Sequence, residues 1–327
     1  MDRLDVKGYA CIGDSLTGGF GGGDVSYPDV LEELLEEEAR KQGGRKAPEV
    51  VNLGVNGEDT VTILGRAGAV PFALTEDLPV PADGRAVPVR FASPLSPETS
   101  LLVYGNSGAE RVYVTAEDGT ELEGVLSLEG GWYTEEYRFR LTGICGASAP
   151  SGMSGTSAPS GVSGASVPAG DRQPAAAEAA QGKSFLVPRG TKLVTRAAKY
   201  YRDYVPIVLM GANGFFRNTE ELILQHRTLL SFYRVPAERA LILGMPVRSR
   251  REMQAMEAEM EAAFGSRYVN VREYMASEGL AAAGLTPTAA DRRAMEAGRV
   301  PDSLLSDGLH FNSIGYEVLG KLVYARL

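Results

Sequence analysis

Apolar and polar positions divide the chain into three stretches, and in the two outer stretches short apolar runs alternate with amphipathic segments. Five runs are expected to form, or to begin with, a strand: 8–12, 49–60, 204–214, 239–247 and 266–275. Five segments have the periodicity or the end signals of helices: 27–44, 59–68, 219–233, 249–265 and 312–327. This alternation predicts an α/β fold with a doubly wound parallel sheet, which binds ligands at the carboxyl ends of its strands.

The middle stretch differs, because its apolar runs are short, alternating and separated by turn residues. The runs are 86–93, 99–105, 110–116, 137–143, 184–188 and 192–197. Turn signals such as Asp118-Gly119 separate them. We therefore expect a small antiparallel β domain at 72–196, inserted into an exposed loop of an α/β domain formed by 1–71 and 197–327.

A repetitive segment at 146–182 stands apart within this β-rich stretch. A nine-residue unit rich in Gly, Ser, Ala and Pro occurs twice and begins a third time. Such a sequence buries too little apolar surface to offset the entropy of ordering it. We expect a flexible linker between two strands, not a solenoid.

The net charge of −9 and the pI of about 5.0 disfavour a nucleic-acid-binding protein, which is more often basic. Two cysteines, Cys11 and Cys145, imply neither a disulfide framework nor a metal site. The N-terminus has no apolar signal core, and no window approaches a membrane span. These features favour a cytoplasmic protein without membrane insertion, or a secreted one if its N-terminus has been trimmed; the oligomeric state is left open.

The glycine-rich segment at 13–24 raises two alternatives, a phosphate-binding loop and the seat of a nucleophile. No lysine stands where a Walker loop requires one, and the glycine spacing of the dinucleotide fingerprint fails. Asp14 and Asp24 would also repel a phosphate. Ser15 is therefore a candidate nucleophile, with Phe20 and Asp14 as possible substrate-lining residues.

A serine nucleophile requires a base and a group that orients the base. Of the two histidines, His310 has an aspartate three positions earlier, Asp307, and this spacing places both side chains on one side of a turn. His226 lies within the helix-like segment 219–233, where a packing or surface role is the simpler interpretation. This arrangement would let Asp307 orient His310 as it takes the Ser15 proton, but taken alone an Asp-x-x-His pair is more often a surface pair.

An oxyanion that forms during acyl transfer requires hydrogen-bond donors. A serine at a strand-to-helix turn offers its own N–H, Gly57 allows close approach of a backbone N–H, and Asn213 offers a side-chain amide. Taken singly, Gly57 is better explained as a turn glycine and Asn213 as a loop-capping asparagine.

Ser15 in Gly-Asp-Ser-Leu, Gly57, Asn213 and the Asp307/His310 pair occur in the order of the four sequence blocks of the GDSL, or SGNH, hydrolases, a superfamily that the chain closely resembles over about 6–68 and 200–327. The resemblance implies a flavodoxin-like three-layer α/β/α fold with a parallel sheet. It also implies Ser15 as nucleophile, His310 as base with Asp307 as its partner, and an oxyanion hole made by Ser15, Gly57 and Asn213. It implies no metal and no cofactor.

One residue departs from the family pattern. The third block usually reads Gly-x-Asn-Asp, but Gly214 stands in the last place here. Asn213 is retained, so the oxyanion donor survives, while the support that the missing carboxylate gives its loop must come from elsewhere.

The resemblance makes a serine esterase the leading interpretation, most simply one that removes a small acyl group such as acetyl from a carbohydrate. A lysophospholipase or thioesterase is the alternative among enzymes. A glycan-binding surface module is the alternative outside enzymes, and it draws on three aromatic residues of the β-rich stretch, Trp132, Tyr133 and Tyr137. Such aromatics are more often β-core residues than a platform for sugars.

Overall fold

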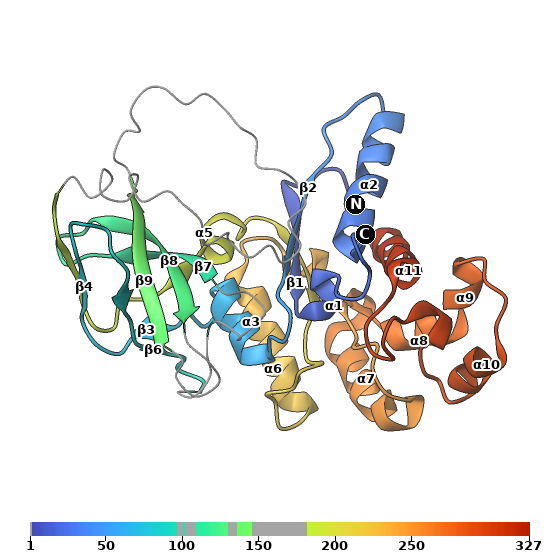
Figure 1. The fold of residues 1–327 in the computed structure, drawn as a ribbon. Helices are drawn as coiled ribbons and strands as arrows, with labels where there is room; N and C mark the ends of the chain where they lie inside the picture. The colour runs from blue at the N-terminus through green and yellow to red at the C-terminus, as the bar shows by residue number, and fades with distance from the viewer. Residues whose placement is uncertain (1, 97–100, 102–108, 130–135, 146–181) are drawn as a thin grey trace. The chain divides into compact units, whose positions relative to one another are not determined.

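The computed structural model describes residues 2–96, 101, 109–129, 136–145 and 182–327 (Figure 1). The chain forms two compact units. The first comprises Met1–Ile63 and Tyr201–Leu327, and the second comprises Leu64–Tyr200. The boundaries expected from the sequence, 71/72 and 196/197, stay a prediction.

The first unit is built on a five-stranded sheet in which every strand pair is parallel. Its order is β14-β13-β12-β1-β2, with bounds Tyr268–Val269, Leu241–Leu243, Val205–Leu209, Gly8–Gly13 and Glu49–Gly54. Counted along the chain this is the strand order 2-1-3-4-5 of flavodoxin-like sheets. The α/β prediction is confirmed, and the central strand β1 ends where the glycine-rich segment begins.

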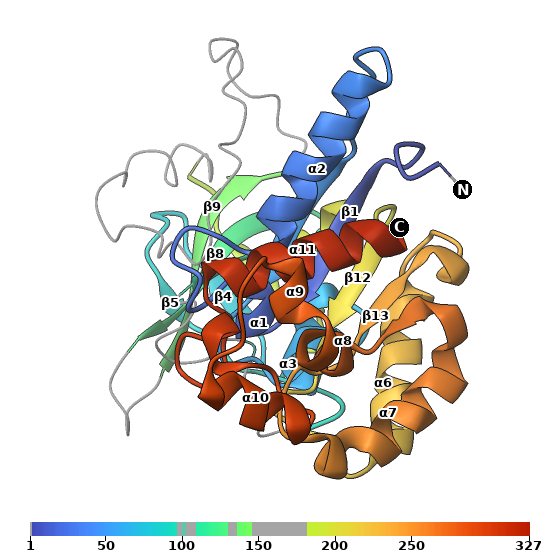
Figure 2. The same ribbon diagram turned by 90° about the vertical axis from the view of Figure 1, so that its right-hand side faces the viewer.

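Helices cover both faces of this sheet. Right-handed connections place α2 (Tyr27–Lys41) on one face and α6 (Thr219–Phe232) with α7 (Arg250–Phe264) on the other, because the chain moves in opposite directions from β1 to β2 and from β12 to β14. The C-terminal helix α11 (Ser313–Arg326) packs beside α2, while α6 lies across the sheet (Figures 1 and 2). The remaining helical segments are α1 (Ser15–Gly18), α3 (Thr60–Ala67), η1 (Ala237–Arg239), η2 (Gly265–Arg267), α8 (Val271–Ser277), α9 (Gly279–Ala282), α10 (Ala289–Glu296) and η3 (Asp302–Leu304).

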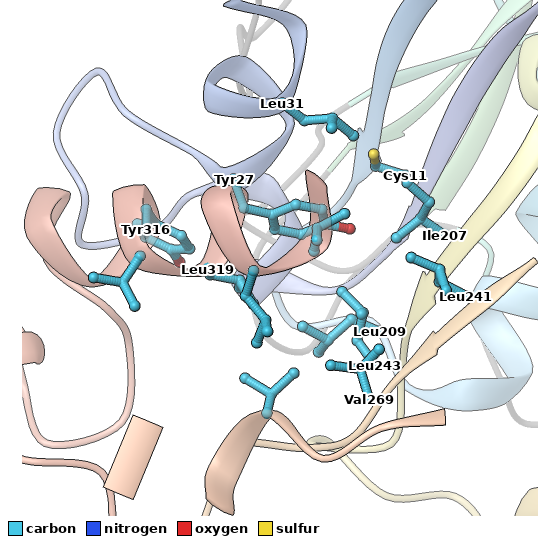
Figure 3. Packing of buried hydrophobic residues seen from close by; sticks show 14 of the residues in the cluster. Cys11, Tyr27, Leu31, Ile207, Leu209, Leu241, Leu243, Val269, Tyr316 and Leu319 are labelled. Carbon is cyan, nitrogen blue, oxygen red and sulfur yellow. The ribbon is translucent and has the colours of Figure 1, made fainter. Parts of the chain in front are cut away.

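The core beneath α2 and α11 is made by alternate residues of the strands and by the inward faces of both helices (Figure 3). Tyr27, Tyr316 and Leu319 are fully buried there. Gly320 permits the close approach of α11 to α2, since a Cβ at that position would lie 2.5 Å from the Cβ of Val30. Burial of this kind contributes about 1.5–3 kcal/mol for each large apolar side chain.

The second unit is antiparallel. Its main sheet has the order β11-β7-β8-β9-β5, with bounds Val194–Thr195, Ala109–Thr115, Glu121–Glu129, Glu136–Ile144 and Val87–Pro88. Two short pairs accompany it, β4 (Leu78–Val80) with β10 (Phe185–Val187) and β3 (Ala73–Leu74) with β6 (Phe91–Ala92), and α5 (Arg196–Tyr200) follows β11. The apolar residues of these strands form a separate core.

Two details differ from the sequence-based expectation. Only Tyr268–Val269 of the segment 266–275 is strand, because Asn270 accepts a hydrogen bond from the N–H of Glu273 and starts α8 at once. The strand β8 was not anticipated, although its buried residues alternate. The linker at 146–182, most of the run 99–105, and Trp132 with Tyr133 lie outside the described residues, and no described helix is both long and apolar enough to cross a membrane.

Candidate active site

Ser15 lies at the carboxyl end of the central strand, in a tight turn from β1 into α1. A Cβ on Gly13 would lie 2.2 Å from the carbonyl oxygen of Leu209, so only glycine fits at the strand end. Asp14 caps α1 by accepting a hydrogen bond from the N–H of Leu16 at 2.9 Å. The turn leaves Ser15 9% exposed, so its hydroxyl sits at the sheet edge where the α/β fold predicts a site.

The structure brings Ser15, His310 and Asp307 together. Ser15 Oγ lies 2.9 Å from His310 Nε2, and His310 Nδ1 lies 2.7 Å from Asp307 Oδ2. The other carboxylate oxygen of Asp307 accepts the backbone N–H groups of His310 at 2.8 Å and Leu309 at 3.0 Å. The three predicted side chains therefore form one continuous hydrogen-bonded chain.

The charge of Asp307 determines which atoms of this hydrogen-bonded chain donate and which accept. The backbone and side-chain hydrogen bonds from His310 lower the pKa of Asp307 to about 2, so the carboxylate is ionised and accepts the Nδ1–H. His310 Nε2 is then the acceptor for the Ser15 hydroxyl hydrogen. In this tautomer the imidazole has a free acceptor nitrogen within hydrogen-bond distance of the Ser15 hydroxyl.

Two aromatic side chains lie around the Ser15–His310 pair, and only one of them, Phe20, was expected from the sequence. The Phe20 ring lies 4.6 Å from the imidazole, centroid to centroid, and is 50% exposed. The hydroxyl of Tyr316 donates to the backbone carbonyl of Phe20 at 2.9 Å. It also lies 3.4 Å from the backbone carbonyl oxygen of Ser15. Tyr316 thereby links α11 to the turn that carries Ser15. The one sequence feature that points to this role is the position of Tyr316 near the start of the C-terminal helix.

The loops of Gly57 and Asn213 are joined by hydrogen bonds. Asn213 Nδ2 donates to the carbonyl of Glu58 at 2.9 Å, which leaves the second amide hydrogen for a ligand. Gly57 has a φ of 80°, a left-handed conformation that favours glycine. The loop that carries Gly57 also reaches β1, since the N–H of Val55 donates to the carbonyl of Gly13 at 3.1 Å.

Gly214, which replaces the usual aspartate of the third block, adopts a φ of 80°. Its carbonyl accepts the N–H of Thr60 at 3.3 Å, and the Thr60 hydroxyl donates to the carbonyl of Phe215 at 3.0 Å. Thr60 is fully buried. Hydrogen bonds from Thr60 therefore support the Asn213 loop from the side of α3.

Asp14, considered a candidate substrate-lining residue, has no exposed surface for a substrate. Its Oδ2 has no hydrogen-bond partner in the described part of the chain. Burial raises the pKa of Asp14 to about 7, and the nearby charge of Glu58 adds to this rise. Asp14 therefore acts on the site through the serine turn.

His226 and the cysteines lie away from this chemistry. His226 is buried on α6 with Nδ1 2.8 Å from the carbonyl of Leu222, and it packs against Phe264 of α7. Cys11 is buried in β1, where desolvation raises the pKa of its thiol, and Cys145 is half-buried and follows β9. Both cysteines are free thiols.

No family model matches the chain, and no curated protein matches it. A solved structure described as "Peptidoglycan O-acetylesterase in action, 5 min" is similar to it with a TM-score of 0.34 and 12% identity, over 98% of this chain and 90% of that one. A TM-score of this size does not establish a common fold.

Proposed function

We propose that the protein is a carboxylic ester hydrolase that forms an acyl-enzyme on Ser15. The observation that carries the proposal is the hydrogen-bonded chain from Ser15 Oγ through His310 to Asp307, with contacts of 2.9 and 2.7 Å. A nucleophile within hydrogen-bond reach of a base that a third group orients is the signature of nucleophilic catalysis.

The geometry supports a two-step reaction. Ser15 Oγ attacks the ester carbonyl carbon while its proton passes to His310 Nε2, and His310 then gives this proton to the departing alkoxide as the carbon–oxygen bond breaks. A water molecule deprotonated by His310 next attacks the acyl-enzyme, which releases the acid and restores Ser15. Asp307 stabilises the imidazolium in both steps.

The negative oxygen of each tetrahedral intermediate is assigned to the backbone N–H groups of Ser15 and Gly57 and to the Asn213 amide. The fixed Asn213–Glu58 contact supports this role, because a donor held in place before the reaction costs no reorganisation during it. Loss of one such donor typically costs about 2.7–4 kcal/mol of transition-state stabilisation.

For the substrate we propose a short acyl ester of a carbohydrate, of which the acetyl ester is the simplest. The exposure of Phe20 and Asp307 beside the nucleophile supports an open site that admits a bulky polar alcohol.

The first experiment is hydrolysis of p-nitrophenyl acetate by the wild type and by Ser15→Ala. We expect the substitution to lower kcat by roughly 10⁶-fold, because it removes the group that carries the acyl intermediate. Ser277→Ala, which changes an exposed serine of α8, is the matched control and should leave kcat unchanged. Absence of activity in the wild type, or its survival in Ser15→Ala, would refute the proposal.

A further inference from the structure

A cavity of about 430 Å³ opens beside the Asn213 loop. Its walls come from this loop, from the segment that follows β13, and from the first turns of α7. The volume lies within the range of about 300–1,000 Å³ that small-molecule sites occupy. It is also far larger than an acetyl methyl group requires.

Methionine side chains form much of the wall. Met245 and Met253 are buried and Met256 is half-buried, and Val247 adds a branched apolar side chain. Flexible, polarisable thioethers adapt to apolar ligands of varied shape. The wall suits a chain of methylene groups.

Arg248 gives this apolar cavity a single charge, since it is the one charged residue among those described that line it. Its guanidinium has no hydrogen bond or ion pair with any residue in the described ranges. The nearest carboxylate in sequence, Glu252, accepts hydrogen bonds from the N–H and hydroxyl of Ser249, at 2.9 and 2.7 Å. These bonds lower the pKa of Glu252, and the charge of Arg248 adds to the effect without a hydrogen bond or ion pair between the two side chains. An exposed guanidinium that lines a cavity and makes no hydrogen bond within the described ranges is available to bind an anion.

The backbone supports the same interpretation. Arg248 has a φ of 62°, in the left-handed region that residues other than glycine seldom adopt. Such strain concentrates at sites that hold ligands, where the surrounding structure fixes a side chain in a set direction.

The position of the cavity identifies which part of an ester it takes. His310 precedes α11 and reaches Ser15 from the sheet face covered by α2 and α11, whereas the cavity is lined by α7, which covers the opposite face (Figure 2). The leaving oxygen must face His310 to receive its proton. An acyl chain that points away from His310 can then enter the cavity, whose lining includes Asn213.

We infer that this cavity binds the acyl part of the ester and that Arg248 selects an acyl chain ending in a carboxylate, so that the preferred substrates are monoesters of dicarboxylic acids. The inference rests on the proposed ester hydrolysis at Ser15, and for the acyl part it replaces the acetyl group by a longer chain that ends in a carboxylate. Ser15 forms the new carbon–oxygen bond at the ester carbonyl, the alcohol leaves with the proton from His310, and water releases the dicarboxylic acid. The distal carboxylate takes no part in bond making.

The test compares two 4-nitrophenyl esters of equal chain length, the hexanoate and the monoester of adipic acid. In the wild type we expect kcat/KM to be at least about 10-fold higher for the adipate monoester, as a charge-assisted hydrogen bond allows. Arg248→Gln should bring this ratio to about one, because it removes the charge that distinguishes the two esters. Arg248→Gly, which suits the positive φ, is a second variant with the same expectation.

Arg251→Gln is the matched control, because it removes the same charge from an exposed position of α7 that does not line the cavity. It should leave the ratio unchanged, and the rate with Ser15→Ala supplies the background. Equal kcat/KM values for the two esters in the wild type, or a preference that survives in Arg248→Gln, would overturn the inference alone. Failure to hydrolyse either ester would instead refute the proposed function.

Discussion

Asp307 occupies an exposed position for a residue that we propose to orient a catalytic base, with 44% of its side chain accessible. Hydrogen bonds, and not burial, fix the position of this carboxylate, since its two oxygens accept the imidazole Nδ1–H and two backbone N–H groups. These bonds lie within one turn, so the orientation of the carboxylate is built into the local backbone.

Asp307→Asn should therefore lower kcat by up to about 10⁴-fold, because an amide that donates to Nδ1 stabilises the wrong tautomer and cannot balance the imidazolium charge. The measurement is kcat for p-nitrophenyl acetate. Asp302→Asn, at an exposed aspartate of η3 in the same segment, is the control and should keep wild-type kcat. An unchanged kcat in Asp307→Asn would show that His310 needs no partner.

The two contacts of the hydrogen-bonded chain from Ser15 to Asp307 differ in how well the sequence predicts them. The Asp307–His310 contact follows from three-residue spacing, because such neighbours share one side of a turn. The Ser15–His310 contact spans 295 positions, and only the order of the four family blocks pointed to it. The burial of Asp14 and the hydrogen bonds of Tyr316 to the serine turn depend on tertiary packing, which no local pattern encodes.

At the level of elements, a buried ion pair joins α7 to α8. Arg272, 1% exposed on its side chain, donates two hydrogen bonds of 2.5 Å to the carboxylate of Glu257 and a third to the carbonyl of Gly298. Both charges are buried, so each depends on the other for compensation.

Arg272→Met should destabilise the protein by about 3–5 kcal/mol, because it leaves the Glu257 carboxylate buried without a counter-charge. The double variant Arg272→Met with Glu257→Met should recover most of this loss. Urea unfolding of the wild type, both single variants and the double variant measures the four free energies. A double variant as unstable as the sum of the singles would mean that the pair does not act as a unit.

The elements themselves were predictable where hydrophobic periodicity was strong and connections were short. The strands 205–209 and 241–243 and the helices α2, α6, α7 and α11 follow this pattern. The start of α8 was missed because Asn270, read as part of a strand, serves as its cap. The β8 strand was missed because Gly124 breaks its apolar alternation in the sequence, while its neighbour Phe139 fills the space above that glycine.

For the molecule as a whole, His226 makes stability depend on pH. Burial lowers its pKa from 6.5 to about 4, so the folded protein holds it neutral while the unfolded chain binds a proton below about pH 6.5. The contribution of His226 to stability is therefore complete above pH 6.5 and is lost progressively as the pH falls toward 4. The loss at pH 4 is on the order of 3 kcal/mol.

Unfolding free energies measured in urea between pH 8 and pH 4 test this linkage. The wild type should lose stability more steeply below pH 6.5 than His226→Gln, which carries no titrating group at that position. Parallel curves for the two proteins would mean that His226 titrates alike in the folded and unfolded chains.

The hydrogen bond from the Thr195 hydroxyl to the carbonyl of Arg66 has a consequence for the order of assembly. Strand β1 must find β12 across roughly 200 intervening residues, which makes their pairing costly in chain entropy. Once the unit from Leu64 to Tyr200 has folded, this bond holds its entry and exit together, and the effective separation falls to roughly 70 residues. The entropic barrier to forming the central sheet then drops by about 1 kcal/mol. Folding of the second unit thus shortens the loop that the pairing of β1 with β12 has to close.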